Sequence, residues 1–395
     1  MVTGVLTVGV ACGDNAPGSK SSTTTVDLAQ LDVGNLATQP KPYGKATSID
    51  QGRIVAAMRL GNYVPLPMEI EPEVAYSPAA TSGVRLFTDF DSGAISGRMT
   101  APAARLNEAA KGFLSGFVST GRSSAKPTLS YELDNVVMLF DTEKDAGAAA
   151  NELAAAEIGT AADSRSVKIG KFPTAQTQTL PDKPGLIRSW YSVGRYVIFT
   201  YIYDSVMAEL KVVEESKLVS RIEKSIDLIS QRVKDFPAPA PDKLTDTDID
   251  LDGMLARALP TVVSDQSQIG IPGVYDRHGG LQLSSYPRGD VKLFEETGVD
   301  RVSWKGNFVY RARDAAGAQR IADEHGKLSR YFRRVEPPKG LPFASCREYR
   351  GSQAQAIKFY CTVSYDRYAT EVAANQLADA HQRVSAQYAI LANSK

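Results

Sequence analysis

Two cysteines near the end of the chain, Cys346 and Cys361, are spaced so that they could form a disulfide. They flank Gly351 and Ser352, and the residues on both sides alternate in the manner of a β-hairpin. Because both lie at similar distances from the turn, we expect them on facing positions of antiparallel strands, where the Cα separation suits a disulfide. They would pair in an oxidising compartment, whereas in the cytoplasm they would remain buried thiols.

The third cysteine, Cys12, follows an apolar run from Val2 to Ala11 that is too short to span a bilayer. A tract rich in Ser, Thr and Gly follows, from Asn15 to Thr25. This arrangement resembles the lipobox of bacterial lipoproteins, although Gly9 replaces the usual Leu and no Lys or Arg precedes the apolar run. The resemblance implies that residues 1–11 are a truncated signal peptide and that Cys12 carries a lipid anchor. The alternative is an ordinary buried or free cysteine.

Carboxylates at alternate positions, Asp248, Asp250 and Asp252, precede Gly253 in the pattern that opens an EF-hand calcium loop. Such a loop needs a bidentate Glu at its twelfth position, but that position is Leu259. The alternative is an acidic segment that caps a helix expected to follow it. The sequence favours the cap, and we predict no metal site and no other cofactor.

Histidines supply few candidates for acid–base or metal chemistry. His278 lies in one turn with Asp276, and the two could form an acid–base pair, although a polar loop histidine is the favoured interpretation. His325 and His381 have no second His or Cys one helical turn away, so no zinc site is predicted. The chain also lacks the G-x-S-x-G, Walker and HExxH motifs, which favours a non-catalytic protein over a hydrolase with an unrecognised site.

Aromatic side chains gather on the strands expected near the end of each half of the chain. Trp190 and Tyr191 lie on one strand, Tyr201 and Tyr203 lie on its hairpin partner, and Tyr365 has a similar place in the second half. Such a face could line a groove for a glycan or a lipid. The favoured alternative is that these side chains form the sheet core beneath the long helices.

A short basic segment, Arg330-Tyr-Phe-Arg-Arg334, is predicted to end a helix. The negative end of that helix would explain the arginines, and contact with an anionic lipid or a cell-wall phosphate is the alternative. Over the whole chain 45 basic and 45 acidic residues balance, so no overall charge attracts nucleic acid.

The length of 395 residues indicates about two domains. Residues 12–47 are poor in aromatic and β-branched clusters and are predicted to be a flexible, lipid-anchored tether. Alternating Pro and Ala predict a semi-rigid linker over residues 237–244. The two domains are therefore expected at 48–236 and 245–395.

The two domains repeat one order of predicted elements. Each has a helix, a strand, a helix that begins near an Asp and small residues, a strand hairpin and a long final helix. The junctions before the final helices match most closely, at Thr200-Tyr-Ile-Tyr-Asp204 and Thr362-Val-Ser-Tyr-Asp366. The pattern predicts an α+β fold of two tandem, similar domains, each with helices on one face of an antiparallel sheet. Ferredoxin-like connections are one arrangement that fits.

The lipobox, the polar tether, the motif Leu31-Asp-Val-Gly-Asn35 followed by Pro40 and Pro42, and the two halves together resemble a family of uncharacterised lipoproteins. That family occurs in mycobacteria, nocardiae and related actinobacteria and has a duplicated domain of unknown function. The resemblance implies the outer face of the plasma membrane and assigns no catalytic residues.

We therefore predict a non-catalytic cell-envelope lipoprotein that binds a ligand or protein through its paired domains. The predicted partners are the membrane, through the lipid anchor, and an envelope glycan, lipid or protein, but not nucleic acid. An envelope hydrolase and a purely structural envelope protein are the alternatives.

Overall fold

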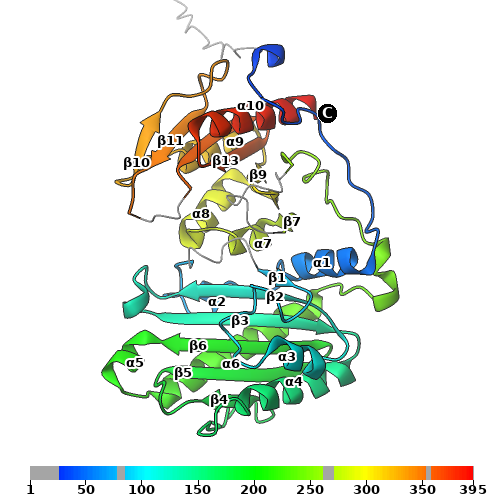
Figure 1. Ribbon diagram of the computed structural model, residues 1–395, viewed down its shortest axis with the longest axis vertical. Coiled ribbons are helices and arrows are strands. Elements are labelled where there is room, and N and C mark those ends of the chain that lie inside the picture. The colour runs from blue at the N-terminus through cyan, green and yellow to red at the C-terminus, as the bar shows by residue number, and fades with distance from the viewer. Residues whose placement is uncertain (1–25, 78–84, 261–270, 353–356, 395) are drawn as a thin grey trace, which may run out of the picture.

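The computed structural model describes residues 26–77, 85–260, 271–352 and 357–394, which form two domains stacked one above the other (Figure 1). Each domain is built around one antiparallel sheet, of six strands in the first domain and seven in the second. The α+β class and the two-domain organisation predicted from the sequence are confirmed.

The first domain has the strand order β1-β2-β3-β6-β5-β4. Its strands are β1 Leu86–Phe87, β2 Phe113–Arg122, β3 Tyr131–Phe140, β4 Gln176–Thr179, β5 Leu186–Val193 and β6 Tyr196–Asp204. Its helices are α1 Ile49–Leu60, α2 Pro67–Ile70, α3 Ala103–Ala109, α4 Glu143–Ile158, α5 Ser205–Leu210 and α6 Glu215–Arg232.

The second domain has the strand order β10-β11-β12-β13-β9-β8-β7. Its strands are β7 Gly273–Asp276, β8 Arg301–Trp304, β9 Phe308–Arg311, β10 Phe332–Val335, β11 Ser345–Tyr349, β12 Phe359–Tyr365 and β13 Tyr368–Ala374. Its helices are α7 Arg277–Gln282, α8 Pro287–Thr297, α9 Ala315–His325 and α10 Leu377–Asn393.

Helices cover both faces of each sheet, which corrects the prediction that they would cover one. In the first domain Leu153 of α4 packs with Phe199 on one face, and Ile226 of α6 packs with Ile202 on the other. Helices α9 and α10 divide the faces of the second sheet in the same way. The physical reason is that β3 and β6 are buried along nearly their whole length, so neither face can be left to solvent.

The predicted repeat appears in the strand order. The order β1-β2-β3-β6-β5-β4 corresponds to β7-β8-β9-β13-β12-β11, and the second sheet adds β10 at its margin. In each unit the last strand, β6 or β13, lies between the strand before the covering helix and the hairpin partner. That is the split β-α-β connection of ferredoxin-like folds.

The two helices predicted to begin near an Asp do so. Thr142 accepts a hydrogen bond from the backbone N–H of Asp145 at the start of α4, at 3.1 Å. Asp314 does the same for Gly317 at the start of α9, at 2.8 Å. These caps satisfy backbone donors that the first helical turn leaves free.

The segment before the first domain is not free along its described length, residues 26–47, which corrects that part of the flexible-tether prediction. Leu31 is buried in the core of the second domain beside Leu341. The amide of Gln382, on α10, donates to Asp32 at 3.1 Å, and Asn393 donates to the carbonyl of Thr38 at 2.9 Å. Apolar and amide contacts therefore hold this segment along the second domain. Cys12 lies outside the described residues.

The predicted Pro/Ala linker is also packed against the protein. Phe236 and Leu244 are buried in the same apolar cluster as α1. Two side chains at its ends therefore fix the path of the extended segment between them.

The two domains share one apolar cluster where they meet. Met58 of α1 and Phe117 of β2 belong to it, together with Tyr275 and Leu283 of the second domain. Hydrogen bonds also cross this boundary between the domains, here called the seam. Gln282 donates to the carbonyl of Val64 at 2.6 Å and accepts from Ser119 at 2.9 Å. The domains therefore form a packed interface.

Candidate functional site

The predicted disulfide is present. Cys346 of β11 and Cys361 of β12 are directly opposed in the strand register, with their Cα atoms 4.2 Å apart, and their sulfurs are bonded. Both side chains are buried beneath α10. The hairpin that the sequence predicted is what brings them together.

The three aspartates of the calcium hypothesis have other contacts. Asp250 accepts hydrogen bonds from the backbone N–H groups of Leu255 and Ala256, at 2.8 and 2.9 Å. Asp252 forms ion pairs with Arg301 and Arg311, at 3.1 and 2.9 Å. These carboxylates are occupied by the backbone and by arginines. The helix that they were expected to cap is instead a series of turns after Gly253, so Asp250 caps a turn.

Asp248 is held through its backbone: it forms a β-bridge with Lys45, and its carbonyl accepts a hydrogen bond from Arg59. Among the described residues, the single group of three His, Cys, Asp or Glu side chains close enough to share a metal ion is Cys346, Cys361 and His381. Its two sulfurs are joined in the disulfide.

His278 does not pair with Asp276. Its Nε2 lies 2.8 Å from Glu69 and 3.0 Å from Arg232, both in the first domain, while the Asp276 carboxylate caps α7 by accepting from Gly279. Burial raises the pKa of Glu69, but the hydrogen bonds and charge of His278 and the hydrogen bond from Arg232 outweigh it and lower the pKa to about 2. The histidine is thus part of a hydrogen-bonded bridge across the seam.

The aromatic residues considered for a groove are largely core residues. Trp190 is fully buried beneath α4, and Tyr201 packs against the same cluster. Tyr191 points to the opposite face, toward α6, and Tyr365 packs under α10. Tyr203 is half-buried at the end of β6. Alternation along the strands separates Trp190 from Tyr191, so the set does not form one surface.

The outer margin of the second sheet is strongly basic. Residues 327–350, here called the basic edge, contain seven Lys or Arg and two Glu, a net charge of +5 in a chain whose total charge is zero. They include strands β10 and β11, at the far side of the second domain from the first (Figure 1). Strand β7, at the other margin of the sheet, packs on α1 at the seam. One margin is thus covered and the basic one is open.

The basic segment Arg330-Tyr-Phe-Arg-Arg334, predicted to end a helix, instead enters β10, and α9 already ends at His325. This segment is extended and not helical because all four residues of β10 pair with β11, which makes β10 the outer strand of the sheet. Beside β10 the surface is hollowed by about 510 Å³, lined by Arg333, Arg334, Val335, Glu336, Pro337, Pro342, Ala344, Cys346 and Leu377.

The basic edge combines paired and unpaired arginines. Arg333 and Arg350 both contact Glu348, at 2.9 and 3.1 Å. Arg334 and Lys339 are exposed and have no ion-pair partner among the described residues. Arg330 stacks on the ring of Tyr331 at 4.5 Å, also without a described acidic partner. Three exposed cations are therefore available to an anionic partner.

The chain enters the structure beside this basic edge. Leu31 packs with Leu341, in the loop between β10 and β11, and also lies against Gly340. Sequence reasoning missed this arrangement because it separated the N-terminal segment from the second domain. The basic edge could have been predicted from the sequence through the net positive charge of residues 327–350.

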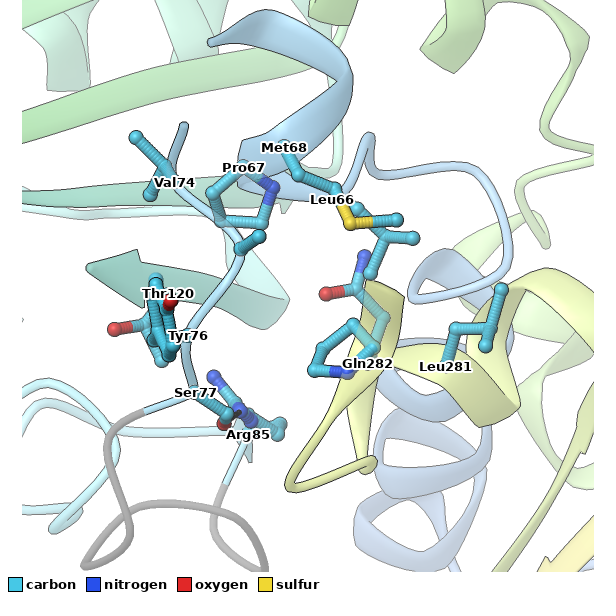
Figure 2. A pocket seen from close by; sticks show the side chains of 13 residues that line it. Leu66, Pro67, Met68, Val74, Tyr76, Ser77, Arg85, Thr120, Leu281 and Gln282 are labelled. Atoms are coloured by element: carbon cyan, nitrogen blue, oxygen red, sulfur yellow. Dashed lines mark hydrogen bonds between the residues drawn. The ribbon is translucent and has the colours of Figure 1, made fainter. Parts of the chain in front are cut away.

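A small cavity lies at the seam between the domains, shown in Figure 2. Its volume is about 10 Å³, which is the space for a single water molecule. Leu66, Pro67 and Leu281 line it together with Arg85 and Gln282. A cavity of this size does not hold the ligand that was expected in a cleft between the paired domains.

Two family models match the chain and together span most of it. They are described as "Domain of unknown function (DUF7373)", the N-terminal part matching residues 43–249 and the C-terminal part matching residues 254–394. The chain belongs to the DUF7373 family. The two matches correspond to the two sheets of the structure, as expected for a duplicated domain of unknown function.

Other comparisons add little to this family assignment. The extracellular domain of PknH from Mycobacterium tuberculosis is similar over 49% of this chain and 100% of that chain, with 12% identity and a TM-score of 0.30. A likeness this low carries no argument. No curated protein matches the DUF7373 chain. None of the helices in the described part of the chain has the length and hydropathy of a membrane-spanning segment.

Proposed function

We propose that this DUF7373 protein is a non-catalytic, extracytoplasmic lipoprotein, anchored through Cys12, that binds anionic lipid headgroups through its basic edge. The observation that carries the proposal is the position of the edge, since the chain from Cys12 enters the structure beside it. The anchor and the cations would then face the same membrane.

The disulfide supports a location outside the cytoplasm. Cys346 and Cys361 are joined, and such bonds persist in oxidising compartments and are rare where glutathione and thioredoxin keep thiols reduced. The lipobox around Cys12 is an independent reason to propose export.

The chain length supports contact between the edge and the membrane. Thirteen residues lie between Cys12 and Val26, the first described residue, and at about 3.5 Å per step the fourteen steps reach at most about 50 Å. Leu31 packs beside the loop of the basic edge, so the chain that leads to Cys12 starts next to the edge.

The number of exposed cations on the basic edge sets the expected free energy of membrane binding. A Lys or Arg near an anionic bilayer surface contributes about 1 kcal/mol, so Arg330, Arg334 and Lys339 together contribute about 3 kcal/mol. A single acyl chain binds a membrane reversibly, and a basic patch is one of the second signals that make anchoring stable.

The hydrolase alternative gains no support from the contacts of the candidate residues. His278 is held by Glu69 and Arg232, so its described partners are those of a structural bridge. Binding in a cleft between the domains is disfavoured by the water-sized cavity at the seam.

Vesicle binding tests the basic edge. Unacylated protein carrying Cys12→Ser should sediment with vesicles that contain phosphatidylglycerol and not with vesicles of phosphatidylcholine alone. Binding should weaken as salt is raised, because the attraction is screened. Replacing Arg330, Arg334 and Lys339 with Gln should weaken binding about 100-fold, which corresponds to 3 kcal/mol.

The matched control replaces three exposed lysines of the first domain, Lys144, Lys183 and Lys234, with Gln. This variant has the same net charge as the edge variant and should bind anionic vesicles like the unaltered protein. Equal loss in both triple variants would mean that total charge, and not the basic edge, determines binding.

Mass spectrometry of the native protein tests the anchor. A mature N-terminus at acylated Cys12 that disappears on treatment with globomycin is the expected result. A protein that starts at Met1 without lipid would refute the anchor and remove the reason to place the edge at a membrane.

A further inference from the structure

Arg85 is an arginine buried at the seam with unsatisfied donors. Only 2% of its surface is exposed. Its Nη2 donates to the hydroxyl of Ser77 at 3.2 Å, whereas Nε and Nη1 have no hydrogen-bond partner among the described residues. Unpaired N–H groups of a buried guanidinium are costly because the hydration they lose is not replaced.

The charge of Arg85 is also uncompensated. The nearest carboxylate that acts on it, Asp134, is itself in a buried ion pair with Arg98 at 2.7 Å. Residues 78–84, which precede Arg85 in the sequence, include no Asp or Glu. The neighbouring Glu132 is already paired with Arg122 at 2.8 Å. The buried group of Arg85, Arg98 and Asp134 therefore has two cations and one carboxylate.

Burial and the neighbouring Arg98 lower the pKa of Arg85 to about 10, against the opposing effect of Asp134. A guanidinium with this pKa is still charged at neutral pH. An uncompensated buried charge of this kind is strongly destabilising unless a counter-charge reaches it.

Arg85 is one of the residues that line the small cavity at the seam. Figure 2 shows Arg85 beside Ser77, with Thr120 on the same side of the cavity and Gln282 opposite. Thr120, whose hydroxyl interacts with Asp134, lies on the same wall as Arg85. Gln282 is held by Val64 and Ser119 and is part of the fixed wall.

We propose that this cavity binds a monatomic anion such as chloride, held by Nε and Nη1 of Arg85. Charge-assisted hydrogen bonds to an anion would satisfy both donors and neutralise the excess cation. A volume of about 10 Å³ suits a single atom and excludes phosphate or sulfate. A water molecule could accept the same hydrogen bonds, but it would leave the charge uncompensated.

Bromide soaking tests the site directly. Crystals of the full chain soaked in sodium bromide should show an anomalous peak in the cavity, at hydrogen-bond distance from Nε or Nη1 of Arg85. Density without an anomalous signal would identify a water molecule and overturn the proposal.

Thermal unfolding tests the site in solution. At constant ionic strength, replacing gluconate with 100 mM chloride should raise the Tm by roughly 2–4 °C, because the anion binds the folded protein alone. The Arg85→Met variant should lose this dependence. In Arg195→Met, which removes a half-buried arginine at the β5–β6 hairpin, the dependence should remain. Equal chloride dependence with and without Arg85 would refute the assignment, and should Arg85→Met not fold, the bromide result decides.

Discussion

At the scale of single residues, the hydrogen-bonded bridge of Glu69, His278 and Arg232 ties the domains together. Glu69 lies 2.5 Å from Arg232, within its own domain, and 2.8 Å from His278, in the second domain. Its pKa falls from an ordinary 4.5 to about 2. A carboxyl whose pKa is lowered on folding stabilises the folded state above its unfolded pKa, and this contribution is lost as the pH falls toward the folded value.

The Glu69→Gln variant should therefore be less stable than the unaltered protein at pH 7, by up to about 3 kcal/mol, with a difference that shrinks between pH 4.5 and pH 2. Urea unfolding at pH 7 and pH 3 measures this. Glu295→Gln, at an exposed site on α8, is the control and should cause little change at either pH. A Glu69→Gln deficit of the same size at both values would contradict the assigned pKa.

At the scale of elements, helix packing decides whether replacing a helical glycine with alanine stabilises the protein. Two glycines show the difference. Gly52 lies in α1, where an added Cβ would come within 2.4 Å of the backbone carbonyl oxygen of Leu244. Gly147 lies in α4, where an added Cβ would meet nothing within 4 Å. Replacing glycine with alanine favours a helix by about 1 kcal/mol when space is free.

Gly147→Ala should accordingly raise the free energy of unfolding by about 0.5–1 kcal/mol. Gly52→Ala should lower it, because α1 must move away from the segment that holds Leu244. Chemical denaturation of both variants gives the comparison. Stabilisation by both substitutions would show that α1 is not packed as described.

The shared apolar cluster makes the two domains one cooperative unit at the scale of the whole molecule. Met58 and Tyr275, from different domains, are each 2% exposed within it. Neither domain can unfold without exposing the partner surface of the other, so we expect a single unfolding transition.

Calorimetry and fluorescence should report the same midpoint, and Tyr275→Ala should lower the stability of both domains together, by about 3–5 kcal/mol as for other large core aromatics. Two separate transitions, with the first domain unaffected by Tyr275→Ala, would mean that the seam is a weak contact.

Local signals in the sequence were sufficient for several features of the fold. The strand hairpin predicted the facing positions of Cys346 and Cys361, because register follows from distance to the turn. The Asp and small residues near the starts of α4 and α9 predicted where these helices begin, because the cap that starts a helix bonds to a neighbour three residues away. The repeated order of elements predicted two similar domains.

Contacts between distant segments were decided by the tertiary structure alone. The segment around Leu31 was expected to be free, yet it lies beside Leu341, about 310 residues later, because the second domain offers an apolar site that composition does not reveal. His278 was matched with its sequence neighbour Asp276 but binds Glu69 of the other domain. The cavity at Arg85 likewise exists because the two domains meet there. The sequence by itself thus determined the class, the repeat and the disulfide, whereas the seam and the open basic edge depend on how the two sheets pack, which no local pattern encodes.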